Sequence, residues 1–156
     1  MDYKKIVVPL IKYNKTQLFY NNDKVLVELP IMKCKSGIEK YFNKYQLILK
    51  IDDEEFLKFI NSLETNNRKY CRKDSIYKSN VNTYNNRNSL ILKVPYRYNR
   101  LEVNIKSDRI YLPTIEDISP GMELRCKMFV PKIWNYNTND KIMSGSIMEV
   151  KEIYIV

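Results

Sequence analysis

Short apolar runs with the period of a β-strand recur along this chain, and they leave room for only one confident helix. In residues 24–35 (KVLVELPIMKCK), Val25, Val27, Leu29 and Ile31 alternate with mainly polar positions. A period of two places these side chains on one face of a half-buried strand. The proline at position 30 indicates an edge strand or a bulge, because proline cannot donate to a β-ladder.

Similar strand patterns occur at residues 45–51, 89–95, 100–105, 122–136 and 146–156, and further apolar runs occur at 3–13 and 110–112. The tally is roughly eight strands with one or two short helices, which is typical of a small all-β barrel or sandwich. At 156 residues, the chain is most simply one domain over 1–156 with a hydrophobic core of its own. The sequence therefore predicts an all-β, closed-barrel fold.

The predicted helix covers residues 53–64. Asp52 is expected as its N-cap, with acidic residues in the first turn where the helix dipole favours them. Phe56, Ile60 and Leu63 recur at the spacing of one helical face. A short amphipathic helix is therefore expected to cover the sheet.

The net charge of the chain is concentrated in residues 68–100. This stretch has nine cations against the single acid Asp74, and the whole chain has a net charge of +9. The cations are Arg68, Lys69, Arg72, Lys73, Lys78, Arg87, Lys93, Arg97 and Arg100. Five tyrosines are interleaved with them: Tyr70, Tyr77, Tyr84, Tyr96 and Tyr98. Residues 68–88 lack apolar periodicity and are expected to form a long exposed basic loop inserted in the barrel.

Cations interleaved with aromatic rings suit a polyanion whose bases can stack, so the segment predicts nucleic-acid binding. Tyr96 and Tyr98 are the first stacking candidates because they follow a predicted strand, and Tyr70, Tyr77 and Tyr84 come second. Phosphate contacts are assigned to Arg68, Lys69, Arg72, Lys73, Lys78, Arg87, Arg97 and Arg100. The alternative is a solvated basic loop whose tyrosines pack back onto the body. Phe129 and Trp134, in a long apolar strand, are expected in the core.

The end of the chain has a recognisable pattern. Residues 118–124 (ISPGMEL) lead into FVPKIW at 129–134, and a hairpin around 137–145 precedes a final strand over 147–156. This resembles the closing half of OB-fold single-stranded-DNA-binding proteins, in particular those of large nucleocytoplasmic, poxvirus-like DNA viruses. The resemblance implies an OB-like barrel and sequence-tolerant binding of single-stranded DNA in viral replication, recombination or repair.

Several function classes are disfavoured by the composition. The chain has no histidine, three glycines and three widely spaced cysteines. These features argue against a histidine-based triad, a phosphate-binding glycine loop and a zinc site, so neither an enzyme nor a cofactor or metal is expected. The acidic run at 52–55 is explained by the helix start. No signal peptide or membrane span is visible, and we expect an intracellular, reducing location, in the host cytoplasm or nucleus if the protein is viral.

Two other functions start from the same basic segment. One is a virion packaging protein that binds nucleic acid by charge alone, and the other is a protein-interaction module that docks an acidic partner. RNA as a ligand and a homo-oligomer paired through an edge strand stay open from sequence. The expected partner is single-stranded DNA, with no membrane association.

Overall fold

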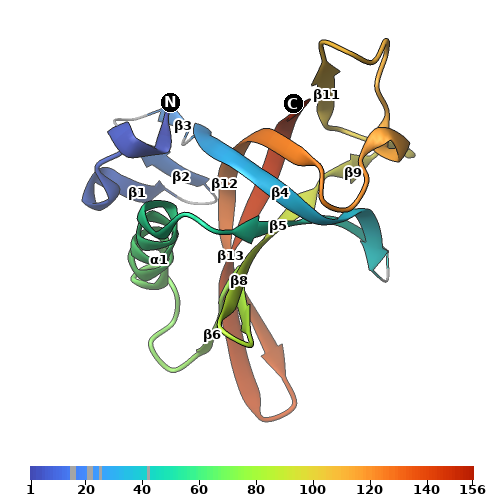
Figure 1. Ribbon diagram of the computed structural model, residues 1–156. Coiled ribbons are helices and arrows are strands. Elements are labelled where there is room, and N and C mark those ends of the chain that lie inside the picture. Colours follow the sequence, from blue (N-terminus) through green and yellow to red (C-terminus); the bar gives the residue numbers. More distant parts are fainter. Residues whose placement is uncertain (15–16, 21–22, 25, 42) are drawn as a thin grey trace.

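Five long strands form a closed barrel in the computed structural model, which describes residues 1–14, 17–20, 23–24, 26–41 and 43–156 (Figure 1). The strands are β4 (Leu26–Tyr41), β5 (Lys44–Ile51), β8 (Arg87–Val94), β12 (Glu123–Thr138) and β13 (Lys141–Ile155). They pair in the order β13-β12-β4-β5-β8. A parallel pairing of Lys93 on β8 with Glu149 on β13 closes the ring. The predicted all-β closed barrel is confirmed.

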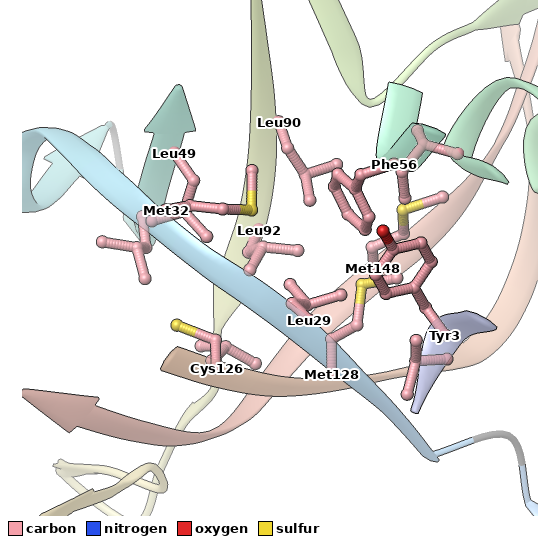
Figure 2. Packing of buried hydrophobic residues seen from close by; sticks show 14 of the residues in the cluster. Tyr3, Leu29, Met32, Leu49, Phe56, Leu90, Leu92, Cys126, Met128 and Met148 are labelled. Atoms are coloured by element: carbon pink, nitrogen blue, oxygen red, sulfur yellow. The ribbon is translucent and has the colours of Figure 1, made fainter. Parts of the chain in front are cut away.

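The alternation of apolar residues fills the inside of this barrel. β5 and β8 pair antiparallel, and Leu47, Leu49, Leu90 and Leu92 are all buried on the inner side. Side chains from β4, β12 and β13 complete the core, among them Met128 (Figure 2). Fully burying one such side chain stabilises the fold by roughly 1.5–3 kcal/mol.

Pro30 lies at a bulge and not at a sheet edge. β4 pairs with both β5 and β12, and its register with β12 shifts between the pairs Ile31–Arg125 and Glu28–Lys127. The shift accommodates the proline, which has no N–H to donate. Of the two readings of this proline, the bulge is the one observed.

The helix α1 (Glu54–Arg68) begins and ends later than predicted. Its N-cap is Asp53, whose carboxylate accepts hydrogen bonds from two first-turn amides. The helix continues past Leu63 because buried polar contacts replace the apolar stripe. Asn66 Nδ2 donates to the carbonyl of Ile11 (3.1 Å), and Asn67 Nδ2 donates to Ser146 Oγ (3.2 Å). α1 is not long and apolar enough to cross a membrane, and it is the longest helix in the described ranges.

Residues 68–88 are largely exposed, as predicted, but they do not form one long loop. After the helix, the chain forms β6 (Ile76–Lys78), which pairs parallel with β13, and β7 (Val81–Tyr84), which pairs antiparallel with β8. The sequence did not predict these strands because they are short, polar and half-exposed, and they lie at the rim of the barrel.

The remaining elements flank the barrel. At the beginning of the chain lie η1 (Tyr3–Lys5), η2 (Val8–Leu10), β1 (Ile11–Asn14), β2 (Gln17–Tyr20) and β3 (Asp23–Lys24). After β8 come β9 (Tyr96–Arg97), β10 (Arg100–Leu101), β11 (Asn104–Ser107) and η3 (Ile115–Asp117). Residues 100–105, predicted as one strand, thus belong to two. The first, β10, pairs with β9, and the second, β11, runs parallel beside β13.

Candidate nucleic-acid interface

Two tight hairpins present much of the basic segment. Asn85 and Asn86 connect β7 to β8 with φ of 50° and 61°, and Tyr98 and Asn99 connect β9 to β10 with φ of 55° and 61°. Positive φ at both central residues is the mark of a type I′ turn, whose twist matches the flanking strands. Asparagine tolerates this conformation, whereas tyrosine adopts it at a cost. The side chains at these tips are therefore held by ordered backbone.

The β7–β8 hairpin presents one ring and one cation together. Tyr84 is 74% exposed and lies directly opposite Arg87 in the strand register. Arg87 is exposed and makes no ion pair in the described part of the chain. β8 then leads towards the second hairpin, and the stretch from Arg87 to Tyr96 spans at most about 30 Å at the usual rise per strand residue. The two hairpins therefore mark opposite ends of one strand.

The β9–β10 hairpin presents two further rings. Tyr98 is 88% exposed at the turn, and the exposed ring of Tyr96 lies 5.3 Å from the ring of Tyr45, centre to centre. Lys40 Nζ lies 5.9 Å from the centre of the Tyr45 ring. Tyr45 was not among the predicted site residues. Its strand position resembles that of a core residue, and only the pairing of β5 with β8 brings it to Tyr96.

Arg97 is engaged by acids from two parts of the chain. Its guanidinium lies 3.5 Å from a carboxylate oxygen of Glu102 and 3.9 Å from Glu149 Oε1. Glu149 is almost completely buried, and its Oε1 has no hydrogen-bond partner in the described structure. A buried carboxylate needs a compensating cation. Arg97 therefore serves the fold, and its charge is largely neutralised.

Tyr70 and Tyr77 face the body of the protein. The Tyr77 hydroxyl donates to the buried carboxylate of Glu64, and burial together with that carboxylate raises the pKa of Tyr77 above its usual value. The Tyr70 hydroxyl donates to the carbonyl of Ile11 (3.4 Å), and both rings pack against the core. The Arg68 guanidinium lies over the Tyr77 ring, 5.8 Å from its centre. The structure thus gives both tyrosines packing contacts of their own.

The other predicted cations divide into one paired residue and a group of exposed ones. Arg72 donates two hydrogen bonds to Asp74, at 3.0 and 3.1 Å. Lys69, Lys73, Lys78 and Arg100 are exposed, and none of them forms an ion pair among the residues that the structure describes. These four, with Arg87, are the cations best placed for phosphate.

A further aromatic surface lies on the projecting β12–β13 hairpin, where the predictions placed no ligand contact. Trp134 is half-buried and packs on the backbone of Gly145, its partner across the strands, while Tyr136 is exposed two residues further on the same face. Lys78 of β6 is paired beside Gly145. Phe129 is buried, as predicted. The alternation of residues over 132–136 indicates that Trp134 faces outward. The sequence prediction placed Trp134 in the core because the strand as a whole is apolar.

No metal site is apparent over the ranges 1–14, 17–20, 23–24, 26–41 and 43–156, where no three acidic or cysteine side chains gather. Cys34, Cys71 and Cys126 are all buried free thiols. Burial raises the pKa of the Cys126 thiol to about 12. Burial also raises the pKa of the Cys34 thiol, so the thiols of Cys34 and Cys126 are protonated and unreactive at neutral pH.

Comparison with known proteins places the fold. No protein-family profile matches the sequence, and no curated protein is significantly similar to it. The chain is similar to the solved structure of a C-terminal truncation of the single-stranded DNA-binding protein from bacteriophage Enc34. That match has a TM-score of 0.54 at 13% identity and covers 92% of this chain and 90% of that chain.

A second solved structure, the single-stranded DNA-binding protein from bacteriophage Enc34 in complex with ssDNA, also matches. Its TM-score is 0.52 at 11% identity, over 93% of this chain and 92% of that chain. At such identities the likeness concerns the fold, which has the architecture expected from the resemblance at the end of the sequence. The chain has an OB-like barrel fold.

Proposed function

We propose that this protein binds single-stranded DNA with little regard to sequence, by stacking bases on exposed tyrosines and by pairing phosphates with lysine and arginine. One observation carries the proposal: ordered turns at the two ends of β8 hold Tyr84 and Tyr98 in solvent, with exposed arginines beside them. The fold is shared with a protein solved in complex with ssDNA. The proposed setting is viral DNA replication, recombination or repair.

The energetics favour rings over charge alone. Each base stacked on an aromatic ring contributes roughly 1–3 kcal/mol, and every base has a face that can stack. Because the hairpins are already ordered, less conformational entropy is lost on binding than a mobile loop would lose. Tyr96, supported by Tyr45, and the Trp134–Tyr136 surface are further stacking positions. A packaging protein that binds nucleic acid by charge alone would not need Tyr98 to be held at a turn with an unfavourable φ.

Phosphate contacts are assigned to five exposed cations of the segment that form no ion pair in the described structure. Each phosphate neutralised on a single strand adds about −0.7 to the slope of log K against log salt. The five cations Lys69, Lys73, Lys78, Arg87 and Arg100 therefore set an upper limit of about −3.5 for their joint contribution. Arg72 and Arg97 add little to this slope because each already faces a carboxylate.

Fluorescence anisotropy with short oligo-dT, duplex DNA and RNA at two salt concentrations tests the proposal. Replacing Tyr96 and Tyr98 together by alanine is expected to weaken oligo-dT binding by about tenfold or more per ring while the salt slope stays unchanged. Tyr111→Ala is the matched control, because Tyr111 is as exposed as Tyr98 but belongs to neither hairpin. Unchanged affinity in the double variant would favour charge-only binding. If none of the three nucleic acids binds, docking of an acidic protein partner becomes the better explanation.

A further inference from the structure

An apolar turn projects from the segment between β11 and η3. Tyr111 is 91% exposed and Leu112 is 74% exposed. Leu112 also has a φ of +49°, in the left-handed region that a branched side chain adopts only at a cost. These two adjacent side chains are large, apolar and exposed to water, and the backbone of one of them is strained. They therefore do not stabilise the core, and such a patch indicates a contact surface.

This turn is fixed from both sides. Before it, the Ser107 hydroxyl accepts hydrogen bonds from the amides of Arg109 (3.1 Å) and Ile110 (3.2 Å). After it, the Thr114 amide donates to the carboxylate of Asp117 (2.7 Å), in a capping box that starts η3. The apolar pair is thus presented by ordered backbone, as a docking element would be.

The surroundings of the turn are acidic, in contrast to the chain as a whole. Residues 108–117 contain Asp108, Glu116 and Asp117 against the single cation Arg109, while the whole chain has a net charge of +9. Any surface that receives the turn should therefore combine an apolar floor with positive charge.

Such a surface exists on the same chain. A pocket of 550 Å³ lies between η2 and α1, with Val8, Pro9 and Phe59 as its apolar lining. Lys58 and Lys69 are the charged residues of its lining, which contains no acid. The pocket therefore matches the turn in both polarity and charge.

The turn and the pocket lie on opposite sides of the molecule. In Figure 1, α1 and the N-terminal turns are on the left, whereas the segment after β11 lies at the upper right. One copy cannot fill its own pocket, but it can fill that of a neighbour. A contact between two different surfaces repeats from copy to copy and forms an open chain if the rotation does not close.

We propose that the Tyr111–Leu112 turn of one copy docks in the η2–α1 pocket of the next, which builds a head-to-tail chain of copies. The contact shares one residue with the proposed function, Lys69, which lies in the pocket lining and is also assigned to phosphate. The role of the contact rests on the proposed function, because copies lined up along one DNA strand would bind that strand cooperatively. The exposed hairpin tyrosines take no part in the contact.

Sedimentation velocity without nucleic acid tests the contact on the full chain. Wild type is expected to sediment faster with increasing concentration and without a plateau at dimer. Leu112→Asn keeps a residue that tolerates positive φ and removes the apolar contact, and Lys58→Glu repels the acidic turn; both are expected to stay monomeric. Ile31→Thr, which removes an exposed aliphatic group elsewhere, is the matched control and should associate like wild type.

Mixing the two defective variants separates this contact from a symmetric one. Leu112→Asn retains an intact pocket and Lys58→Glu an intact turn, so an equimolar mixture should form dimers and nothing larger. Combining Lys58→Glu with Glu116→Lys in one chain should restore longer assemblies. Monomeric wild type, association of either single variant, or absence of dimers in the mixture would overturn the proposal.

Binding to short and long strands links the contact to DNA. Leu112→Asn should bind an oligo-dT of about 16 nucleotides, enough for one barrel, as wild type does. On a long strand it should lose about tenfold in affinity together with its cooperativity. If wild type fails to bind the short strand, the proposed function is wrong, while sedimentation still decides the contact. If the variant remains cooperative on the long strand, the contact is wrong.

Discussion

At the scale of single residues, Arg87 and Arg97 carry the same charge but face different surroundings. Arg87 forms no ion pair in the described chain, whereas Arg97 lies between Glu102 and the buried Glu149. Sequence alone ranked both as phosphate contacts, because Glu149 is distant along the chain and reaches Arg97 only through the closure of the barrel. The sequence shows that both positions carry a cation, but it does not show which carboxylate, if any, each cation contacts.

This difference predicts two different salt dependences. Arg87→Gln should reduce the magnitude of the salt slope on oligo-dT by about 0.7, the value for one phosphate on a single strand. Arg97→Gln should leave the slope unchanged, because its charge is already compensated. The double variant Arg97→Gln with Glu149→Gln controls for an unpaired buried carboxylate. Equal slope changes for both arginines, measured by anisotropy titrations, would contradict the assignment.

Gly145 gives a second prediction at this scale. A Cβ at this position would lie 2.8 Å from Trp134 Cζ2 and 3.0 Å from the carbonyl oxygen of Lys78. Gly145→Ala should therefore displace the indole and destabilise the fold by about 1–3 kcal/mol, the usual range for overpacking. Trp134 is the only tryptophan, so its emission spectrum and a urea titration report both effects. Asn137→Ala, exposed on the same hairpin, should change neither.

At the scale of elements, a buried polar cluster joins residues 68–88 to the body. Glu64 of α1 accepts hydrogen bonds from the Tyr77 hydroxyl, from Ser79 Oγ (2.9 Å) and from the Asn80 amide (2.6 Å). Asn80 Nδ2 in turn donates to the carbonyl of Ser146 on β13 (2.8 Å). These bonds hold β6 and β7 against the barrel, and thereby the β7–β8 hairpin.

Tyr77→Phe should remove one donor from this buried carboxylate. We expect a loss of about 1–3 kcal/mol in the free energy of unfolding, the cost of depriving a buried charged group of one hydrogen bond. Hydrogen exchange should become faster in β6 and β7 before the barrel strands are affected. Tyr84→Phe, on the exposed side of β7, is the control and should leave the free energy of unfolding unchanged. Equal stability of the two variants would show that the cluster does not anchor the segment.

How far sequence predicts these elements depends on what holds each of them. β5 and β8 were predictable because leucines alternate along them and every second one is buried. β6 and β7 were not, because polar bonds from Glu64 and Asn80 replace an apolar face, and such bonds leave no periodicity. The predicted helix ended too early for the same reason. Asn66 and Asn67 are polar residues of a kind that usually indicates a helix end, but in α1 they are buried and hydrogen-bonded. Composition made Tyr84, Tyr96 and Tyr98 candidate site residues, and the structure shows all three rings exposed. Tyr45 and Tyr136 became candidates only through the pairing of the strands.

At the scale of the whole molecule, buried tyrosines make the fold sensitive to alkali. Tyr3 is buried against Phe56 and Phe59, and its hydroxyl donates to Asp53 (3.5 Å). Burial first, and then Asp53, raise the pKa of Tyr3 to about 12. An unfolded tyrosine titrates near 10, so folding favours the protonated form. This stabilisation is complete below about pH 10 and is lost as the pH rises towards about 12.

Urea unfolding of wild type and Tyr3→Phe at several alkaline pH values measures this effect. Wild type should lose on the order of 2 kcal/mol more than Tyr3→Phe between about pH 9 and 12. Lysine titration affects both proteins alike and cancels in the comparison. Parallel pH profiles for the two proteins would show that Tyr3 ionises as easily in the folded state as in the unfolded chain.

The single parallel pairing of Lys93 with Glu149 also determines when the barrel can form. β13 follows β6, β8, β11 and β12 in the sequence and pairs with all of them. During synthesis, therefore, these four strands lack one of their pairing partners until β13 has left the ribosome. Protease challenge of stalled nascent chains should find protection only after β13 has emerged, and protection at shorter lengths would show that a stable half-barrel comes first.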